Sequence, residues 1–261
     1  MALFLHELKR GRLSLIIWCA AVSFLLSVSI LIYPEMATQM NEMTDMFANM
    51  GDFTAAFGMD QLNFGEFMGY FTVECGNQLG LGGALFAGIL GASALSREEK
   101  DKTAEFLLTN PVSRPIITAN KLFALLTELV IFTVCVGGVS LLAAIVIGES
   151  FDLTATLLLF LAYLLLEIEI ALVAFGVSAF IKSGGIGIGL GIGLIFYFVG
   201  IISNLTEQTA FLKYLTPFSF ANGGNIVNDH LIEPKYLAAG AVLAVAGVIT
   251  AFLKYRKKDI C

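Results

Sequence analysis

The chain is built from apolar runs of about 20 residues, each long enough to cross a hydrocarbon layer about 30 Å thick as a helix. These runs account for most of the 261 residues, which leaves no room for a soluble catalytic domain. With 57% hydrophobic and 14% charged residues, the composition also excludes an ordinary soluble globule. We therefore predict an all-α polytopic membrane protein in which residues 1–261 form a single transmembrane domain.

The limits of the runs predict six transmembrane helices. Residues 2–11 form a short amphipathic piece suited to the membrane interface, with Gly11 as a joint into a first span that stops at Pro34. The six spans are expected at 13–33, 67–95, 117–147, 154–181, 185–203 and 236–253. They are separated by an outer loop at 34–66, a central loop at 96–116 and an outer segment at 204–235, and a basic tail follows at 254–261.

The basic residues are distributed very unevenly between the two sides of these spans. Of the 15 Lys and Arg residues, only Lys213 and Lys235 fall on the side that carries the outer loop and the outer segment. The positive-inside rule then places both termini and the central loop in the cytoplasm. The expected location is the plasma membrane of a bacterium or archaeon, as a multi-pass protein.

The central loop combines an amphipathic helix with a rigid turn. Glu98, Asp101, Lys102 and Glu105 share one helical face, and Leu107 and Leu108 lie on another. Pro111 ends this helix, Ser113 can cap the next one, and Pro115 lies in its first turn. This segment is either a solvated loop without a partner or a helix at the membrane surface that binds a partner protein.

The same loop resembles the permease subunits of ATP-binding-cassette transporters of the second exporter class (ABC-2). The residues that carry the resemblance are Glu98/Glu99, Lys102-Thr103, Glu105, Phe106-Leu107-Leu108, Pro111-Val112-Ser113-Arg114 and Lys121. Lys102 stands where many members carry glycine. The resemblance implies an ABC-2 exporter-type fold, with an elbow helix at 2–11 and a cytosolic coupling helix between spans 2 and 3.

The resemblance also implies partners. A second permease copy, identical or related, and two copies of an ABC ATPase subunit are expected, besides the lipid bilayer and without nucleic acid. The ATPase would hold ATP and Mg, since this chain contains no Walker sequence and is not expected to be an enzyme or to bind a cofactor or metal. The ATPase-coupling candidates are Glu98, Glu105, Leu107, Leu108, Pro111, Ser113 and Arg114.

Small residues recur at intervals of four in two spans. In span 2 they are Gly76, Gly80, Ala84, Gly88 and Ala92, and in span 5 they are Gly185, Gly189 and Gly193. Such spacing lets helix backbones approach closely in lipid. Because span 5 lies at the dimer interface in the resembled family, Gly185, Gly189 and Gly193 are our candidates for that interface.

Several polar residues fall at membrane depth, where each charge costs at least about 2.5 kcal/mol. The candidates for a translocation path are Glu74, Asn77, Gln78, Glu167 and Glu169. The alternative is that these carboxyls are hydrogen-bonded packing groups, which is the interpretation that we favour for Glu128. An ion-coupled carrier or channel that uses Glu167 and Glu169, for example for sodium or metal export, is the alternative function.

A stripe of methionines in the outer loop has two interpretations. Met36, Met40, Met43, Met46 and Met50 recur at helical spacing, and thioethers bind Cu(I). The favoured interpretation is the apolar face of a helix on the outer leaflet.

The four cysteines are far apart, so neither a disulfide nor a zinc site is expected. A membrane enzyme is disfavoured, since the only histidines, His6 and His230, lie outside the spans.

These arguments lead to one prediction for function. The chain is expected to be the permease subunit of an ATP-driven ABC exporter that forms the translocation path as a dimer. Its substrate is expected to be a peptide or antibiotic, a drug or another amphiphile.

Overall fold

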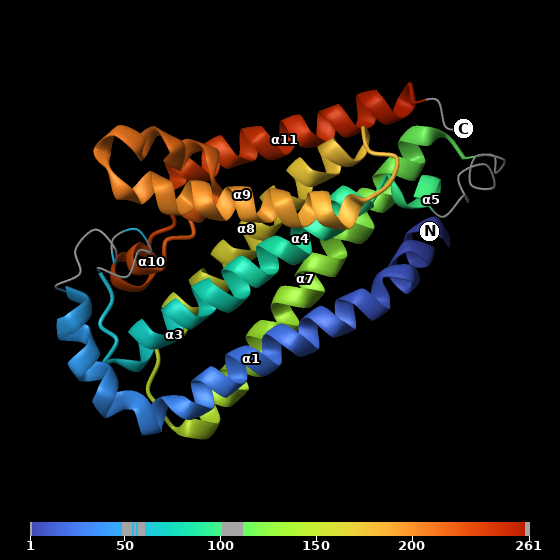
Figure 1. Ribbon diagram of the computed structural model, residues 1–261. Coiled ribbons are helices and arrows are strands. Elements are labelled where there is room, and N and C mark those ends of the chain that lie inside the picture. Colours follow the sequence, from blue (N-terminus) through green and yellow to red (C-terminus); the bar gives the residue numbers. More distant parts are fainter. Residues whose placement is uncertain (1, 49–53, 55, 57–60, 101–111, 259–261) are drawn as a thin grey trace.

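The computed structural model describes residues 2–48, 54, 56, 61–100 and 112–258, and within this part of the chain every regular element is a helix. The first, α1 (Ala2–Ala48), is 47 residues long and contains Pro34. Figure 1 shows that it bends sharply in its second half, as a proline inside a helix often causes. Pro34 therefore bends the first helix and does not end it, contrary to our expectation.

The second predicted span is a continuous helical stretch divided into three elements. These are α3 (Phe67–Cys75), the π-helix η1 (Gly76–Leu81) and α4 (Gly82–Ser93). A π-helix fits an extra residue into a helical turn, and such insertions are frequent at functional sites. After Ser93 the chain makes a tight turn into the short helix α5 (Arg97–Lys100).

The next three helices follow the predicted spans closely. They are α7 (Arg114–Ile147), α8 (Leu153–Ser178) and α9 (Gly185–Leu205). Gly148 ends α7 with a φ of 74°, and Gly184 precedes α9 with a φ of 83°. Both values lie in the left-handed region that glycine adopts without steric cost, so these two residues allow the tight connections between the helices.

The outer segment folds back on the ends of the long helices. It contains the 3₁₀ helices η2 (Glu207–Leu215) and η3 (Pro217–Ser219) and the helix α10 (Gly223–Asp229). The chain then enters the last helix, α11 (Pro234–Arg256). Pro234 and Pro115 each stand in the first turn of a helix, where the missing N–H of proline has no effect on the hydrogen bonds.

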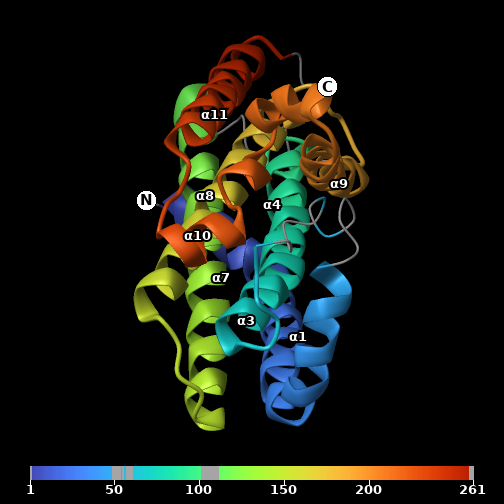
Figure 2. The same cartoon turned by 90° about the vertical axis from the view of Figure 1, so that its left-hand side faces the viewer.

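The long helices pack in three tiers of two (Figures 1 and 2). The middle tier contains α4 and α8, which contact each other along their lengths. Helices α1 and α7 form the tier on one side of it, and α9 and α11 lie on the other side, against α4 and α8 respectively. The core between the tiers is apolar, with Phe86, Phe132, Leu166, Ile170 and Phe175 fully buried.

The start of α1 and the end of α11 lie at the same end of the bundle, which we call the termini end; the opposite end is the far end (Figure 1). In the part of the chain described, five helices are long and apolar enough to cross a membrane: α1, α7, α8, α9 and α11. The second predicted span is divided among α3, η1 and α4, which are nine, six and twelve residues long, so none of the three is long enough to cross a membrane alone.

The expected joint at Gly11 is absent, because α1 continues through it without a break. Two contacts with α7 hold this part of α1 in line. Lys121 Nζ lies 3.1 Å from Glu7 Oε1, and a side chain at Gly11 would collide with the carboxyl group of Glu128. Residues 2–11 thus form the first turns of a long helix packed on α7, and a separate elbow helix is not seen.

Candidate functional site

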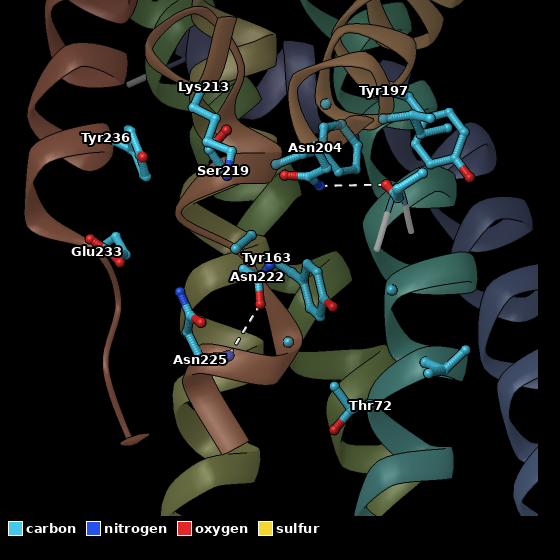
Figure 3. Close-up of a pocket in the computed structure, with 18 of the residues that line it drawn as sticks. Thr72, Tyr163, Tyr197, Asn204, Lys213, Ser219, Asn222, Asn225, Glu233 and Tyr236 are labelled. Carbon is cyan, nitrogen blue, oxygen red and sulfur yellow. Dashed lines mark hydrogen bonds between the residues drawn. The ribbon is translucent and has the colours of Figure 1, made fainter. Parts of the chain in front are cut away.

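A cavity of about 330 Å³ lies at the far end of the bundle. It is enclosed by η1 and α9 on one side and by η2, η3, α10 and the first turn of α11 on the other (Figure 3). Its size is at the lower end of the range for small-molecule sites, and it lies between helices, where such sites often occur in bundles. We therefore take this cavity as the candidate functional site.

The π-helix η1 brings a polar side chain to the wall of the cavity. Gly76 and Asn77 both line it, and Asn77 is exposed although it lies in the middle of a predicted span. No described residue hydrogen-bonds to the Asn77 amide, so its donors and its acceptor are available to a ligand. Of the predicted path residues, Asn77 is the one that the structure places in the cavity.

The spacing of small residues decides where the cavity begins. Nearer the termini end, Gly185, Gly189 and Gly193 of α9 pack directly on the α4 backbone, and a Cβ at Gly193 would lie 3.0 Å from the Ala84 carbonyl oxygen. The next position in this series of fours is Tyr197, which lines the cavity. Its bulky ring cannot fit where a glycine did, so the two helices separate there.

The Tyr197 ring is held in place by aromatic neighbours. Its centroid lies 5.5 Å from that of Phe218 in an edge-on arrangement, and 5.7 Å from that of Phe198. Edge-on pairs at this separation are favourable because the positive ring edge meets the negative ring face. Tyr197 therefore forms a fixed wall between α9 and η3.

Both lysines of the far end line this cavity. Lys235 Nζ lies 3.3 Å from Glu233 Oε2 and 4.7 Å from the centre of the Tyr236 ring. Lys213, from the last turn of η2, is half-buried and has no ion-pair partner among the described residues. The described lining thus contains two cations and one carboxylate, a net charge of about +1 from these residues.

Polar groups from η3 and α10 complete the wall. Ser219 Oγ is buried, and no described residue hydrogen-bonds to it. The Asn222 side chain accepts a bond of 3.1 Å from the Asn225 N–H, which caps the start of α10 and fixes both residues beside the cavity (Figure 3). Asn204 donates to the Ala56 carbonyl oxygen at 3.4 Å.

Glu74 and Gln78, which we also predicted for a path, point toward α1 instead. Gln78 Nε2 donates to Glu74 Oε2 at 2.7 Å and lies 2.9 Å from Ser29 Oγ. The amide, the carboxylate and the hydroxyl form a polar contact between η1, α3 and α1. The structure therefore separates these two residues from Asn77.

The carboxyl groups in the spans share a different setting, in which each faces a glycine of a neighbouring helix. Glu167 lies against Gly83 of α4, and Glu169 lies against Gly240 of α11. Glu128 lies against Gly11 in the same way. A glycine leaves room for a carboxyl group at a close helix crossing. The structure thus places all three glutamates at helix contacts and outside the lining of the cavity.

Glu167 has one identified hydrogen-bond partner. Thr133 Oγ1 of α7 lies 2.8 Å from Glu167 Oε2, while Oε1 has no partner among the described residues. Glu128 and Glu169 likewise each have one buried oxygen without a described partner. Such groups are energetically costly unless they are protonated or hydrated, so Glu167 and Glu169 stay our predicted candidates for an ion path, whereas the contact at Gly11 agrees with a packing role for Glu128.

The predicted ATPase-coupling residues fall only partly within the described structure. Glu105, Leu107, Leu108 and Pro111 lie outside the described residues, as does the side chain of Glu98. Ser113 occupies the N-cap position of α7 as expected, although its side chain makes no capping bond. Its carbonyl oxygen accepts from the N–H groups of Ile116 and Ile117.

Arg114, another coupling candidate, is committed to a contact within the chain. Its guanidinium donates to the carbonyl oxygens of Tyr255, Arg256 and Lys258 at 3.3, 3.4 and 2.5 Å. These are among the carbonyls that a helix C-terminus leaves without helical partners. The start of α7 is thereby attached to the end of α11.

Two further ion pairs strengthen the termini end. Lys258 Nζ lies 2.6 Å from Glu99 Oε1 of α5 and donates to the Ile181 carbonyl oxygen at 2.9 Å. Together with the Lys121–Glu7 pair, these contacts join the termini-end segments of α1, α7, α8 and α11 to α5. Sequence reasoning missed them, because their partners are up to 159 positions apart and follow no spacing rule.

The glycines that we predicted for a dimer interface contact another helix of the same chain. Gly185, Gly189 and Gly193 face α4 of the same chain, where backbone atoms touch backbone atoms. That face of α9 is filled within one copy, so a second copy would have to contact another face. Gly187 and Gly191, on the other side of α9, have open space around them.

The methionine stripe lies mostly outside the described part. Met36 is half-buried and packs on the core, whereas the side chains of Met40, Met43, Met46 and Met50 are not described. Within the described residues no three His, Cys, Asp or Glu side chains gather in a way that could hold a metal ion.

The lysines, Ser219 and the asparagines of the outer segment were not among our predicted site residues. A signal for the lysines was present, because the charge count had already singled out Lys213 and Lys235 as the only basic residues of their side. That count was used for orientation only. Nothing in the spacing of Ser219, Asn222 and Asn225 distinguishes them from ordinary loop residues.

Comparison with known proteins decides the family. Residues 1–260 match the family model described as "ABC-2 family transporter protein". The chain belongs to the ABC-2 transporter family. This ABC-2 protein is therefore a multi-pass membrane component of an ABC transporter. Components of this kind typically carry out transport and no catalysis. No curated protein matches this ABC-2 chain.

Proposed function

We propose that the chain is the permease subunit of an ATP-driven exporter. Two copies of it, or one copy and a related permease, assemble with two ATPase subunits that bind ATP and Mg and supply the energy. The substrate is an amphiphile, such as a peptide, an antibiotic or a drug. The observation that carries this proposal is the family match over residues 1–260, together with the six helical segments that reach from the termini end to the far end.

The orientation follows from charge. Of the 14 basic residues in the described part of the chain, the termini end carries 12 and the far end carries Lys213 and Lys235. The termini end is then cytosolic and the cavity is on the outer side. The stretch α3–η1–α4 serves as the second of the six spans in this arrangement, and both termini and the central loop 96–116 face the ATPase.

Energy would enter through the central loop, which joins the end of α4 to the start of α7. The loop is also tied to the last helix, since Arg114 binds the end of α11 and Glu99 pairs with Lys258. A push on the loop by an ATPase subunit therefore acts on α4, α7 and α11 together. Because α4 continues into η1, this movement reaches the cavity at Asn77.

Co-purification tests the proposal. The chain expressed with the ATPase of its own genome neighbourhood should form a complex that carries out ATP-dependent transport in inverted membrane vesicles. The double substitution L107E/L108E should abolish the complex, while Lys257→Gln, a change of an exposed basic residue, should leave it intact. A chain that transports equally well without any ATPase would contradict the proposal.

An ion-coupled carrier or channel is the alternative function. It is favoured by the buried carboxyl oxygens of Glu167 and Glu169 that lack described partners. Their positions against Gly83 and Gly240 support it less, since they lie at closed helix contacts. In this case Glu167→Gln and Glu169→Gln should stop ion movement in proteoliposomes free of ATP.

A further inference from the structure

We infer that the far-end cavity binds a singly charged anionic group, such as the phosphodiester of a lipid-like amphiphile, between Lys213 and Lys235. This inference names the substrate class of the proposed exporter and rests on that proposal for its transport role only. Binding itself requires neither an ATPase nor ATP, so it is tested separately.

The first argument is the placement of charge. The far end is acidic, with Glu66, Glu149 and Asp152 around a neighbouring hollow, and yet its two basic residues both line one cavity. Lys213 is half-buried in the wall, whereas the Lys235 side chain is 53% exposed, so one lysine lies within the wall and the other on its solvent side. A cavity with low-dielectric walls focuses their field on whatever enters it.

The second argument is that several polar groups of the wall have no partner. Ser219 Oγ is buried without a hydrogen bond from any described residue, and the Asn77 amide and the Lys213 ammonium lack described partners as well. Buried polar groups are usually satisfied, so the buried Ser219 hydroxyl indicates a missing partner, while the exposed Asn77 amide and the half-buried Lys213 ammonium offer further donors to the same space. A phosphodiester offers acceptor oxygens to the donors of all three side chains.

The third argument concerns the charge and shape of the ligand. Glu233 neutralises one of the two lysines, because it pairs with Lys235 at 3.3 Å. The remaining net charge of about +1 fits a monoanion better than a dianion. The aromatic residues Tyr197, Phe218 and Tyr236 line the same cavity as the lysines and supply apolar surface for the rest of an amphiphile; Figure 3 labels Tyr197, Tyr236 and Lys213.

Binding to the full chain in phosphatidylcholine nanodiscs tests this inference. Three probes are compared by competition: short-chain phosphatidylglycerol, short-chain phosphatidylcholine and inorganic phosphate. We expect phosphatidylglycerol to bind with roughly five- to tenfold higher affinity than phosphatidylcholine, because only the former has net negative charge. Inorganic phosphate that competes as well as phosphatidylglycerol would assign the site to free anions, and failure to compete would assign it to lipids.

Two substitutions with opposite expected signs guard against misfolding. Lys213→Met should weaken phosphatidylglycerol binding roughly five- to tenfold, whereas Glu233→Gln should strengthen it roughly threefold by releasing Lys235. A merely damaged protein would lose binding in both. Lys182→Met, which changes an exposed lysine at the termini end, is the matched control and should have no effect.

Two results would overturn the inference. One is equal binding of phosphatidylglycerol and phosphatidylcholine, and the other is a Lys213→Met variant that binds as the parent protein does. If the signs come out as expected but ATP-dependent transport is absent, the anion site stands and the proposed exporter function fails.

Discussion

The contact between α4 and α9 differs sharply along its length. Toward the termini end, the backbones touch at Gly88 and Gly189, with no side chain between them. Toward the far end, a cavity of about 330 Å³ lies beside Tyr197, lined by residues of both α9 and η1. In the series of positions 185, 189, 193 and 197, the change from glycine to tyrosine at position 197 therefore marks where the closed contact of the helices ends and the cavity begins.

The two ends also differ in how their charges are used. At the termini end, Arg114, Lys121 and Lys258 are all engaged by carbonyl or carboxylate oxygens of distant segments. At the far end, Lys213 has no described partner and faces a cavity. Engaged charges fix structure, whereas unengaged charges in a cavity are available to a ligand. We expect substitutions to affect mainly stability at the first end and mainly binding at the second.

The largest effect is expected from Gly189→Leu, which would break the closed contact. A side chain there would collide with the Gly88 backbone, which cannot move aside as a flexible side chain can. We expect the free energy of unfolding to fall by about 2–3 kcal/mol, measured by thermal or denaturant unfolding in detergent.

The matched control is Gly191→Leu on the same helix. Gly191 has no atoms within 4 Å of the space that a Cβ would fill, so the change should stay within about 0.5 kcal/mol. Equal losses in the two variants would show that α9 does not pack on α4 through the Gly189 face.

The next effect is expected from Arg114→Met, which removes the charged donor at the end of α11. Three carbonyl oxygens lose the Arg114 donor, although that of Tyr255 keeps its bond from the Lys258 N–H, and we expect a loss of about 1–2 kcal/mol. Arg256→Met, at an exposed side chain of the same helix end, should cost much less. Unfolding in detergent measures both, and comparable stabilities would show that the Arg114 contact is not part of the closed end.

A smaller effect on stability is expected from Tyr197→Ala at the boundary between the two regions. Loss of the edge-on contacts with Phe218 and Phe198 should cost about 1 kcal/mol. Transport should fall by a larger factor than stability, because the wall of the cavity is lost. Tyr197→Phe keeps the ring and should behave as the parent chain; if it behaves as the alanine variant does, the ring is not the wall.

The smallest effect on stability is expected when the pH is lowered, and it depends on Asp152 at the far end. The Asp152 carboxylate lies 2.8 Å from His230 Nε2 and accepts hydrogen bonds from the N–H groups of Thr154 and Ala155. The bond with His230 is the main reason why the pKa of Asp152 falls below its ordinary value of 3.8, and the two N–H groups lower it further. A lowered pKa means stability that is present above pH 3.8 and is lost as the pH falls through the folded-state value. Asp152→Asn should remove this part of the acid dependence of the unfolding temperature, and an unchanged dependence would contradict it.

The sequence predicted much of the fold because its strongest signals are local. Apolar runs placed α7, α8, α9 and α11 to within a few residues, and Gly148 after α7 and Gly184 before α9 stand where a left-handed residue is required. The series Gly185, Gly189 and Gly193 correctly predicted close backbone packing. It could not say whether the partner is α4 of the same chain or a second copy, because both contacts demand the same spacing.

Other features depend on contacts between distant residues and left no local signal. The absence of a joint at Gly11 depends on Glu128, which fills the space beside it. The continuation of α1 past Pro34 was missed because proline bends a membrane helix without always ending it. For the site, Asn77 was found as a polar residue in an apolar span, whereas Ser219 and Asn225 reach the cavity only through the folding of the outer segment.

The account depends most on which end of the bundle faces outward. Single cysteines at positions 213 and 182, in a background without the native cysteines, can be labelled with a membrane-impermeant maleimide in intact cells. We predict labelling at position 213 in intact cells and labelling at position 182 only after permeabilisation. The reverse pattern would place the cavity in the cytosol and the central loop outside, and it would contradict an exporter driven from the termini end.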